Sequence, residues 1–107
     1  MDTLLVLSNP TSTKYLRGLA LLNRHLERYR EALMLLRFID ALDPGNPQNT
    51  MDVAETLMQL KEFERARRVL EETIERCRSA SAPGAMLEKA TALRDLIARR
   101  GGDAAGA

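Results

Sequence analysis

The sequence predicts an all-α protein made of two antiparallel helix hairpins and a C-terminal capping helix. Apolar residues make up 45% of the chain and charged residues 29%, whereas aromatic residues make up only 4%, a composition that suits helices better than β-sheets. Apolar residues also recur at helical spacing in five segments that turn residues separate. The third observation is an internal repeat, in which five positions recur 34 residues later.

The repeat pairs residues of similar size and chemistry. Small residues fall on small ones, aliphatic residues on aliphatic ones, and an aromatic on an aromatic. A period between about 20 and 50 residues is typical of stacked units that bury their apolar faces against one another. The pairs are Ala20 and Ala54, Leu26 and Leu60, Tyr29 and Phe63, Ala32 and Ala66, and Leu36 and Leu70.

Turn residues place the helices in order along the chain. Asn9 caps a helix that Pro10 opens, although further capping residues follow closely and leave this start defined only to within a few residues. Pro44 and Gly45 end the first hairpin, and an asparagine and a proline then open the next one. The helices are expected at about Lys14–Leu26, Tyr29–Leu42, Gln48–Leu60, Phe63–Arg78 and Ala85–Arg99.

The length allows one small domain, which we expect to span residues 1–100. Residues 101–107 have almost no apolar bulk beyond alanine, which predicts a disordered tail. The apolar run Leu4–Leu7 either covers the open end of the first hairpin or is left for a partner. The two hairpins are expected at about residues 13–43 and 47–78, and the capping helix at about residues 85–99.

Several function classes receive no support from the residues. A net charge of +1 does not predict a nucleic-acid or membrane-surface partner, and Leu4–Leu7 is too short for a signal peptide or a membrane span. The single histidine, His25, has no neighbouring ligands or nucleophile, so we expect no metal, no catalytic residue, no cofactor and no enzyme. The single cysteine, Cys77, cannot form an internal disulfide, which fits a cytoplasmic protein best.

Two further features have a structural and a functional interpretation. Cys77 falls on the apolar face of its helix, where a buried thiol is the favoured interpretation and a reactive thiol the alternative. The charged residues from Glu64 to Glu75 are spaced for ion pairs on a solvated helix face, each worth a few tenths of a kcal/mol. A docking patch for a charged partner is the alternative.

The two hairpins resemble tetratricopeptide repeats. In that family an aromatic residue opens the second helix, an alanine lets the two helices approach closely, and a proline ends the repeat; Tyr29, Ala32 and Pro44 match this order and spacing. The second copy keeps the aromatic and the alanine but has Arg78 in place of the proline. The resemblance implies a tetratricopeptide-like stack that binds a protein or peptide, on a groove lined by the first helix of each hairpin.

Projecting the family's groove positions onto this chain gives a set of expected partner-binding residues. The alternative is that these side chains only pack against the fifth helix. The groove positions are Lys14, Arg17, Leu21, Arg24, His25, Gln48, Met51, Glu55, Met58 and Gln59. The partner-binding residues expected among them are Arg17, Leu21, Arg24, Met51, Glu55 and Met58.

In size, repeat layout and apolar richness, the chain also resembles the small chaperones of bacterial type III secretion. The resemblance rests on residues 15–22 and on the stretch from Tyr29 to Pro44. It implies a cytoplasmic chaperone, in a homo- or hetero-oligomer, that holds an export substrate or a needle component. The alternative is a structural scaffold subunit or a homodimeric interaction module without a chaperone role.

Overall fold

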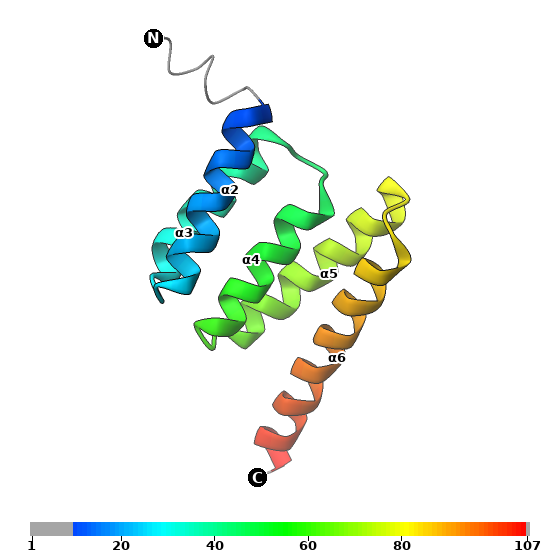
Figure 1. Cartoon of the computed structure of the whole chain (residues 1–107). Coiled ribbons are helices and arrows are strands. Elements are labelled where there is room, and N and C mark those ends of the chain that lie inside the picture. The colour runs from blue at the N-terminus through cyan, green and yellow to red at the C-terminus, as the bar shows by residue number, and fades with distance from the viewer. Residues whose placement is uncertain (1–9, 107) are drawn as a thin grey trace.

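The structure, a computed structural model, describes residues 10–106, with side chains placed for residues 13–100. Five helices and no strand are found in this part of the chain, so the predicted all-α stack is confirmed. Figure 1 shows α2, α4 and α6 following one another across the front, with α3 and α5 behind them. The helices are α2 (Pro10–His25), α3 (Tyr29–Leu42), α4 (Pro47–Gln59), α5 (Phe63–Ala80) and α6 (Gly84–Gly106).

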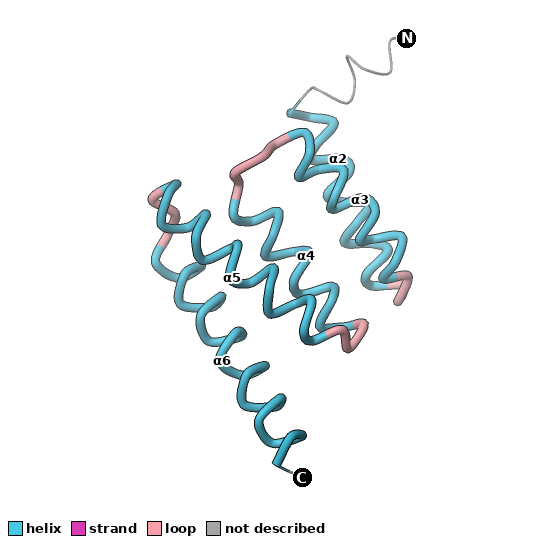
Figure 2. Tube along the Cα trace, turned by 180° about the vertical axis from the view of Figure 1, so that it is seen from behind, coloured by secondary structure: helices cyan, strands magenta, loops and turns pink. Residues whose placement is uncertain are grey.

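Neighbouring helices pack in chain order. Helices α2 and α3 form one hairpin, α4 and α5 form the second, α3 also packs against α4, and α6 packs against α5. The loops that join the helices are short (Figure 2). This stepwise packing is expected of a repeat array, in which each unit contacts only its neighbours.

The break between the hairpins has the predicted chemistry. The side-chain oxygen of Asn46 accepts a hydrogen bond from the backbone N–H of Gln48 at 3.0 Å, and Pro47 occupies the first turn of α4. Gly45 has a φ of +88°, a left-handed conformation that glycine adopts without the strain a side chain would add.

The 34-residue repeat is also present in the backbone. Glu27 and Lys61 each have a φ of 62°, and each ends the first helix of its hairpin. The next N–H then bonds back to the helix, from Arg28 to the carbonyl of Asn23 at 2.7 Å and from Glu62 to that of Leu57 at 2.9 Å. Both turns are therefore helix ends of the Schellman type, and they stand 34 residues apart.

The repeated alanines lie where the helices cross. Ala20, Ala32, Ala54 and Ala66 have no exposed surface, so a larger side chain at any of them would push neighbouring helices apart. Aliphatic side chains fill the rest of the core, which runs through all five helices. They include Leu33, Leu36, Ile39, Val53, Leu57, Leu70, Ile74 and Ile97.

The structure differs from the prediction at the C-terminus. Helix α6 continues to Gly106, whereas the sequence placed its end at about Arg99 and a disordered tail after it. A helix needs only its own backbone hydrogen bonds to continue, and Ala104 and Ala105 have high helix propensity. The prediction considered only the missing apolar bulk. The predicted cap Asn9 and the run Leu4–Leu7 lie outside the described residues.

Candidate partner-binding surface

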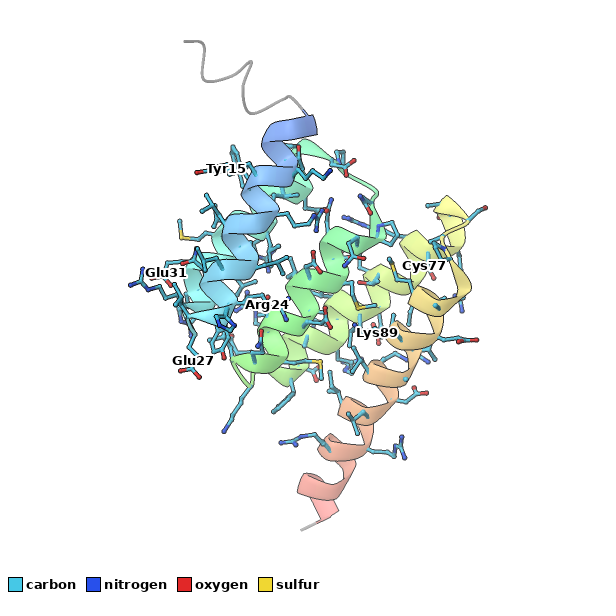
Figure 3. The ribbon with its side chains drawn as sticks, in the orientation of Figure 1. Tyr15, Arg24, Glu27, Glu31, Cys77 and Lys89 are labelled. Atoms are coloured by element: carbon cyan, nitrogen blue, oxygen red, sulfur yellow. The ribbon has the colours of Figure 1, made fainter. Side chains whose placement is uncertain are left out.

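The first helices of the hairpins and α6 are joined by polar side-chain contacts. Arg24 on α2 donates a hydrogen bond through Nε to Oε1 of Gln59 on α4, at 2.8 Å. Lys89 on α6 forms an ion pair with Glu55 on α4, with 2.9 Å between Nζ and Oε2. Figure 3 shows Arg24 and Lys89 on either side of α4. These contacts draw α2, α4 and α6 into one continuous surface.

A hollow of about 250 Å³ opens on this surface. Its apolar part comes from Met58 on α4 and Leu93 on α6, and its rim carries both positive and negative groups. An apolar hollow with a few polar groups around it is the usual form of a site that binds a side chain or a small ligand. The lining residues are Arg24, Glu55, Met58, Gln59, Lys89 and Leu93.

The structure brings three of the six expected binding residues together and places the others elsewhere. Arg24, Glu55 and Met58 line the hollow. Leu21 lies one turn before Arg24 on α2, and 49% of its surface is exposed. Met51 is only 2% exposed and belongs to the core, so it lies behind the surface rather than on it.

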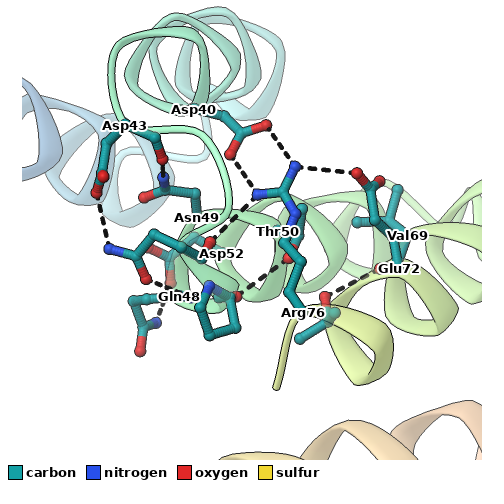
Figure 4. Close-up of polar contacts among 12 residues, drawn as sticks. Asp40, Asp43, Gln48, Asn49, Thr50, Asp52, Val69, Glu72 and Arg76 are labelled. Atoms are coloured by element: carbon teal, nitrogen blue, oxygen red, sulfur yellow. Dashed lines mark hydrogen bonds and ion pairs between the residues drawn. The ribbon is translucent and has the colours of Figure 1, made fainter. Parts of the chain in front are cut away.

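Arg17 holds the two hairpins together. Its guanidinium donates hydrogen bonds to Oδ2 of Asp52 and to Oδ1 of Asn49, both on α4. Gln48 donates to the other oxygen of Asp52 at 2.7 Å, and Asn49 donates to the backbone carbonyl of Asp43 at 2.8 Å (Figure 4). The network satisfies polar side chains that the hairpin interface buries, which is a structural use of Arg17.

Asp52 is the most strongly buried carboxylate of that network, with 7% of its side chain exposed. Burial raises the pKa of Asp52 above its usual value, and the nearby Glu55 carboxylate adds to this increase. The hydrogen bond from Gln48 and the charge of Arg17 oppose the increase without cancelling it. Desolvation is therefore the dominant electrostatic effect at this site.

Two lining residues of the hollow, Lys89 and Leu93, were not among the sequence-predicted positions. Both lie on α6, which takes the place of a third first helix beside α4. The break before α6, from Ser81 to Pro83, differs in length and residues from the break before α4. The 34-residue spacing therefore does not carry into α6, and the sequence offered no way to align its residues with the groove.

The remaining candidate residues have structural roles or lie in solvent. Cys77 is 3% exposed, and burial raises the pKa of its thiol, as expected of a buried small hydrophobe. His25 is exposed at the end of α2. On α5, Arg67 pairs with Glu71 at 2.7 Å and Arg68 with Glu64 at 3.9 Å, on the exposed face that was predicted.

Within the described residues, no group of three histidine, cysteine or carboxylate side chains is placed to hold a metal ion. None of the helices there is both long enough and apolar enough to cross a membrane.

Comparison with known proteins gives one family. The tetratricopeptide repeat family matches residues 24–89, from the end of α2 into α6. No curated protein and no solved structure matches the chain. Domains of this family generally mediate protein–protein interactions and are typically non-catalytic. With more than half of its residues matched and the hairpin stack described above, this chain belongs to the tetratricopeptide repeat family.

Proposed function

We propose that this protein is a chaperone or adaptor that holds a partner polypeptide on the surface of α2, α4 and α6. The observation that carries the proposal is the hollow between α4 and α6, in which Met58 and Leu93 are surrounded by Arg24, Glu55 and Lys89. A protein-binding role is general in the family. The hollow supplies a specific place for it on this chain.

The chemistry of the hollow suits an apolar segment of the partner. Methionine is flexible and fills irregular gaps, so Met58 adapts to different side chains. Leu21 extends the apolar surface toward α2, because it is half-exposed one turn from Arg24. An amphipathic helix or an extended segment would place its apolar residues here and its polar residues against the charged rim.

The charged rim would orient the partner more than it would strengthen binding. Lys89 and Glu55 already form an ion pair at 2.9 Å, and the Lys89 side chain is 56% exposed. Exposed pairs of this kind contribute about 1 kcal/mol or less. Apolar contacts should therefore supply most of the affinity, and added salt should weaken binding only mildly.

Within this class, we propose an export chaperone of bacterial type III secretion, acting in the cytoplasm on an export substrate or needle component. The support is the resemblance in size and repeat layout noted for residues 15–22 and Tyr29 to Pro44. A small repeat domain with apolar surface of its own is suited to shielding an aggregation-prone client.

Co-purification from the native host tests this function. The tagged full chain should retain a specific client, identified by mass spectrometry, and the purified client should raise the chain's denaturation midpoint in a concentration-dependent way. Recovery of a secretion component would support the finer proposal. A chain that unfolds at the same midpoint with and without every retained protein would contradict a holding function.

A further inference from the structure

A second apolar groove lies on the first hairpin, on the side turned away from α4. It has a volume of about 470 Å³. Figure 3 shows Tyr15 and Glu31 projecting on this outer side. Met34 is 74% exposed, which is unusual for a large apolar side chain without a function. The lining residues are Leu16, Glu31, Met34, Leu35 and Phe38, and we call this site the outer groove.

The repeat shows that the outer side of α2 corresponds to a packing face. On α4, Asn49 and Thr56 are completely buried. Their counterparts 34 residues earlier are Tyr15 and Leu22, which are 68% and 52% exposed. Helix α2 therefore presents to solvent the face that α4 buries against the first hairpin.

The outer groove is more apolar than the repeat alone requires. Met34 and Phe38 on α3 correspond to Arg68 and Glu72 on α5, which are charged and exposed. The repeat therefore does not account for apolar residues at these two positions. At the other end of the stack, α6 covers the second hairpin with buried residues such as Ile97. No described element covers the first hairpin in the same way.

We propose that the Leu4–Leu7 segment of this chain occupies the outer groove and caps the first hairpin. The segment carries four consecutive aliphatic residues and joins the stack directly, three residues before Pro10. Pro10 favours an extended conformation in the residue before it, so the chain leaves the axis of α2 at this point.

The distances are compatible with this docking. Leu16 lies about 9 Å along the helix axis from Pro10, at 1.5 Å per residue. The chain from Leu4 to Pro10 reaches roughly 20 Å when extended. Because Phe38 lies on α3, which runs antiparallel to α2, the groove is near the end of the hairpin where the segment enters. Leu26, about 24 Å along α2, is beyond this reach.

A single tryptophan reports on the docking, because the chain contains none of its own. The full chain with Leu5→Trp should show a blue-shifted emission maximum that does not depend on protein concentration. Adding Met34→Lys and Phe38→Lys should return the emission to that of a solvent-exposed indole, with the helical circular-dichroism signal retained. The control pair Leu22→Lys and Leu26→Lys adds the same charge outside the groove and should leave the blue shift unchanged.

Other occupants of the groove would give different results, and each would overturn the proposal. A blue shift that appears only at high protein concentration would indicate a second copy of the chain. A solvent-exposed indole in the isolated protein would leave the groove to another partner. Equal emission with and without the groove substitutions would place the segment elsewhere.

Disulfide formation gives an independent test that tolerates a change at position 5. In a Cys77→Ala background, the pair Val6→Cys and Phe38→Cys should oxidise to an intramolecular disulfide. The pair Val6→Cys and Gly18→Cys is the control, since Gly18 is exposed at a similar distance along α2 but points away from Leu16. Equal oxidation of the two pairs would contradict docking in the outer groove.

Discussion

Arg76 on α5 grips the carboxylate of Asp40 on α3 with both ends of its guanidinium. Its Nη1 donates to Oδ1 at 2.5 Å and its Nη2 to Oδ2 at 3.1 Å (Figure 4). Nη1 also donates to the backbone carbonyl of Asn46 at 3.2 Å, and Nη2 donates to Glu72 at 2.9 Å. These hydrogen bonds, above all the one to Asp40, raise the pKa of Arg76. One side chain thus ties the second helices of the hairpins to the loop between them.

This contact should contribute measurably to stability. In a double-mutant cycle with Arg76→Ala and Asp40→Ala, we expect a coupling energy of about 1–3 kcal/mol, because the bond is bidentate and Arg76 is only 17% exposed. Arg76→Lys should lose much of this energy, since lysine cannot bind both oxygens in the same geometry. Urea denaturation provides the measurement.

The control is an exposed pair on the same helix, Arg78 and Glu75, at 3.4 Å. The same cycle there should give about 0.5 kcal/mol or less. Equal coupling energies for the two pairs would show that the Arg76 contact has no special structural role.

The crossing alanines should tolerate no charge. Ala32→Glu and Ala66→Glu each place a carboxylate where no surface is exposed, so each should lower the free energy of unfolding by several kcal/mol. Ala41→Glu on the exposed side of α3 is the matched control and should change it by about 0.5 kcal/mol or less. If Ala32→Glu and Ala66→Glu unfold at the same urea concentration as the control, the proposed packing is incorrect.

Glycine should stabilise the two left-handed helix ends. Glu27→Gly and Lys61→Gly remove a side chain at a φ of 62° and should each raise the free energy of unfolding by about 0.5–1 kcal/mol. Glu88→Gly, at an exposed position within α6, should instead lower it by about 1 kcal/mol. Thermal or urea denaturation would show whether the three variants differ in sign as expected.

Asp52 should make the protein relatively more stable in mild acid. Because the pKa of Asp52 is raised above 3.8 in the folded state, the folded chain binds more protons at this site than the unfolded chain between the two pKa values. The free energy of unfolding of the wild type, minus that of Asp52→Asn, should therefore increase as the pH falls from about 7 to about 4. A decrease would mean that the ion pair with Arg17 outweighs desolvation.

The sequence predicted the elements that local chemistry determines. Asn46, Gly45 and the prolines fix the break between the hairpins, and the alanine pairs follow from a repeat that requires close packing. Contacts such as Arg17 to Asp52 and Arg76 to Asp40 could not be predicted, because they join residues 35 and 36 positions apart. Which polar groups meet at such distances depends on how the hairpins pack.

The candidate site was only partly predictable for the same reason. Met51 shares a helix with Met58, but the rotation of α4 against its neighbours buries the first and leaves the second at the hollow. Lys89 and Leu93 depend on where α6 comes to rest after its break. Helical spacing predicts which residues share a face, whereas the docking of neighbouring helices decides which face stays open.

The most direct test of the central claim is the affinity of the purified client for a Leu21→Asp/Met58→Asp variant, measured by titration calorimetry. Leu22→Asp/Leu26→Asp is the control, with two exposed leucines of α2 that do not line the hollow. Circular dichroism should show that both variants remain folded. We expect the first variant to bind at least about tenfold more weakly than wild type, because client binding would bury unpaired carboxylates, and the control to bind normally. Wild-type affinity in a folded Leu21→Asp/Met58→Asp variant would contradict a binding site on the surface of α2, α4 and α6.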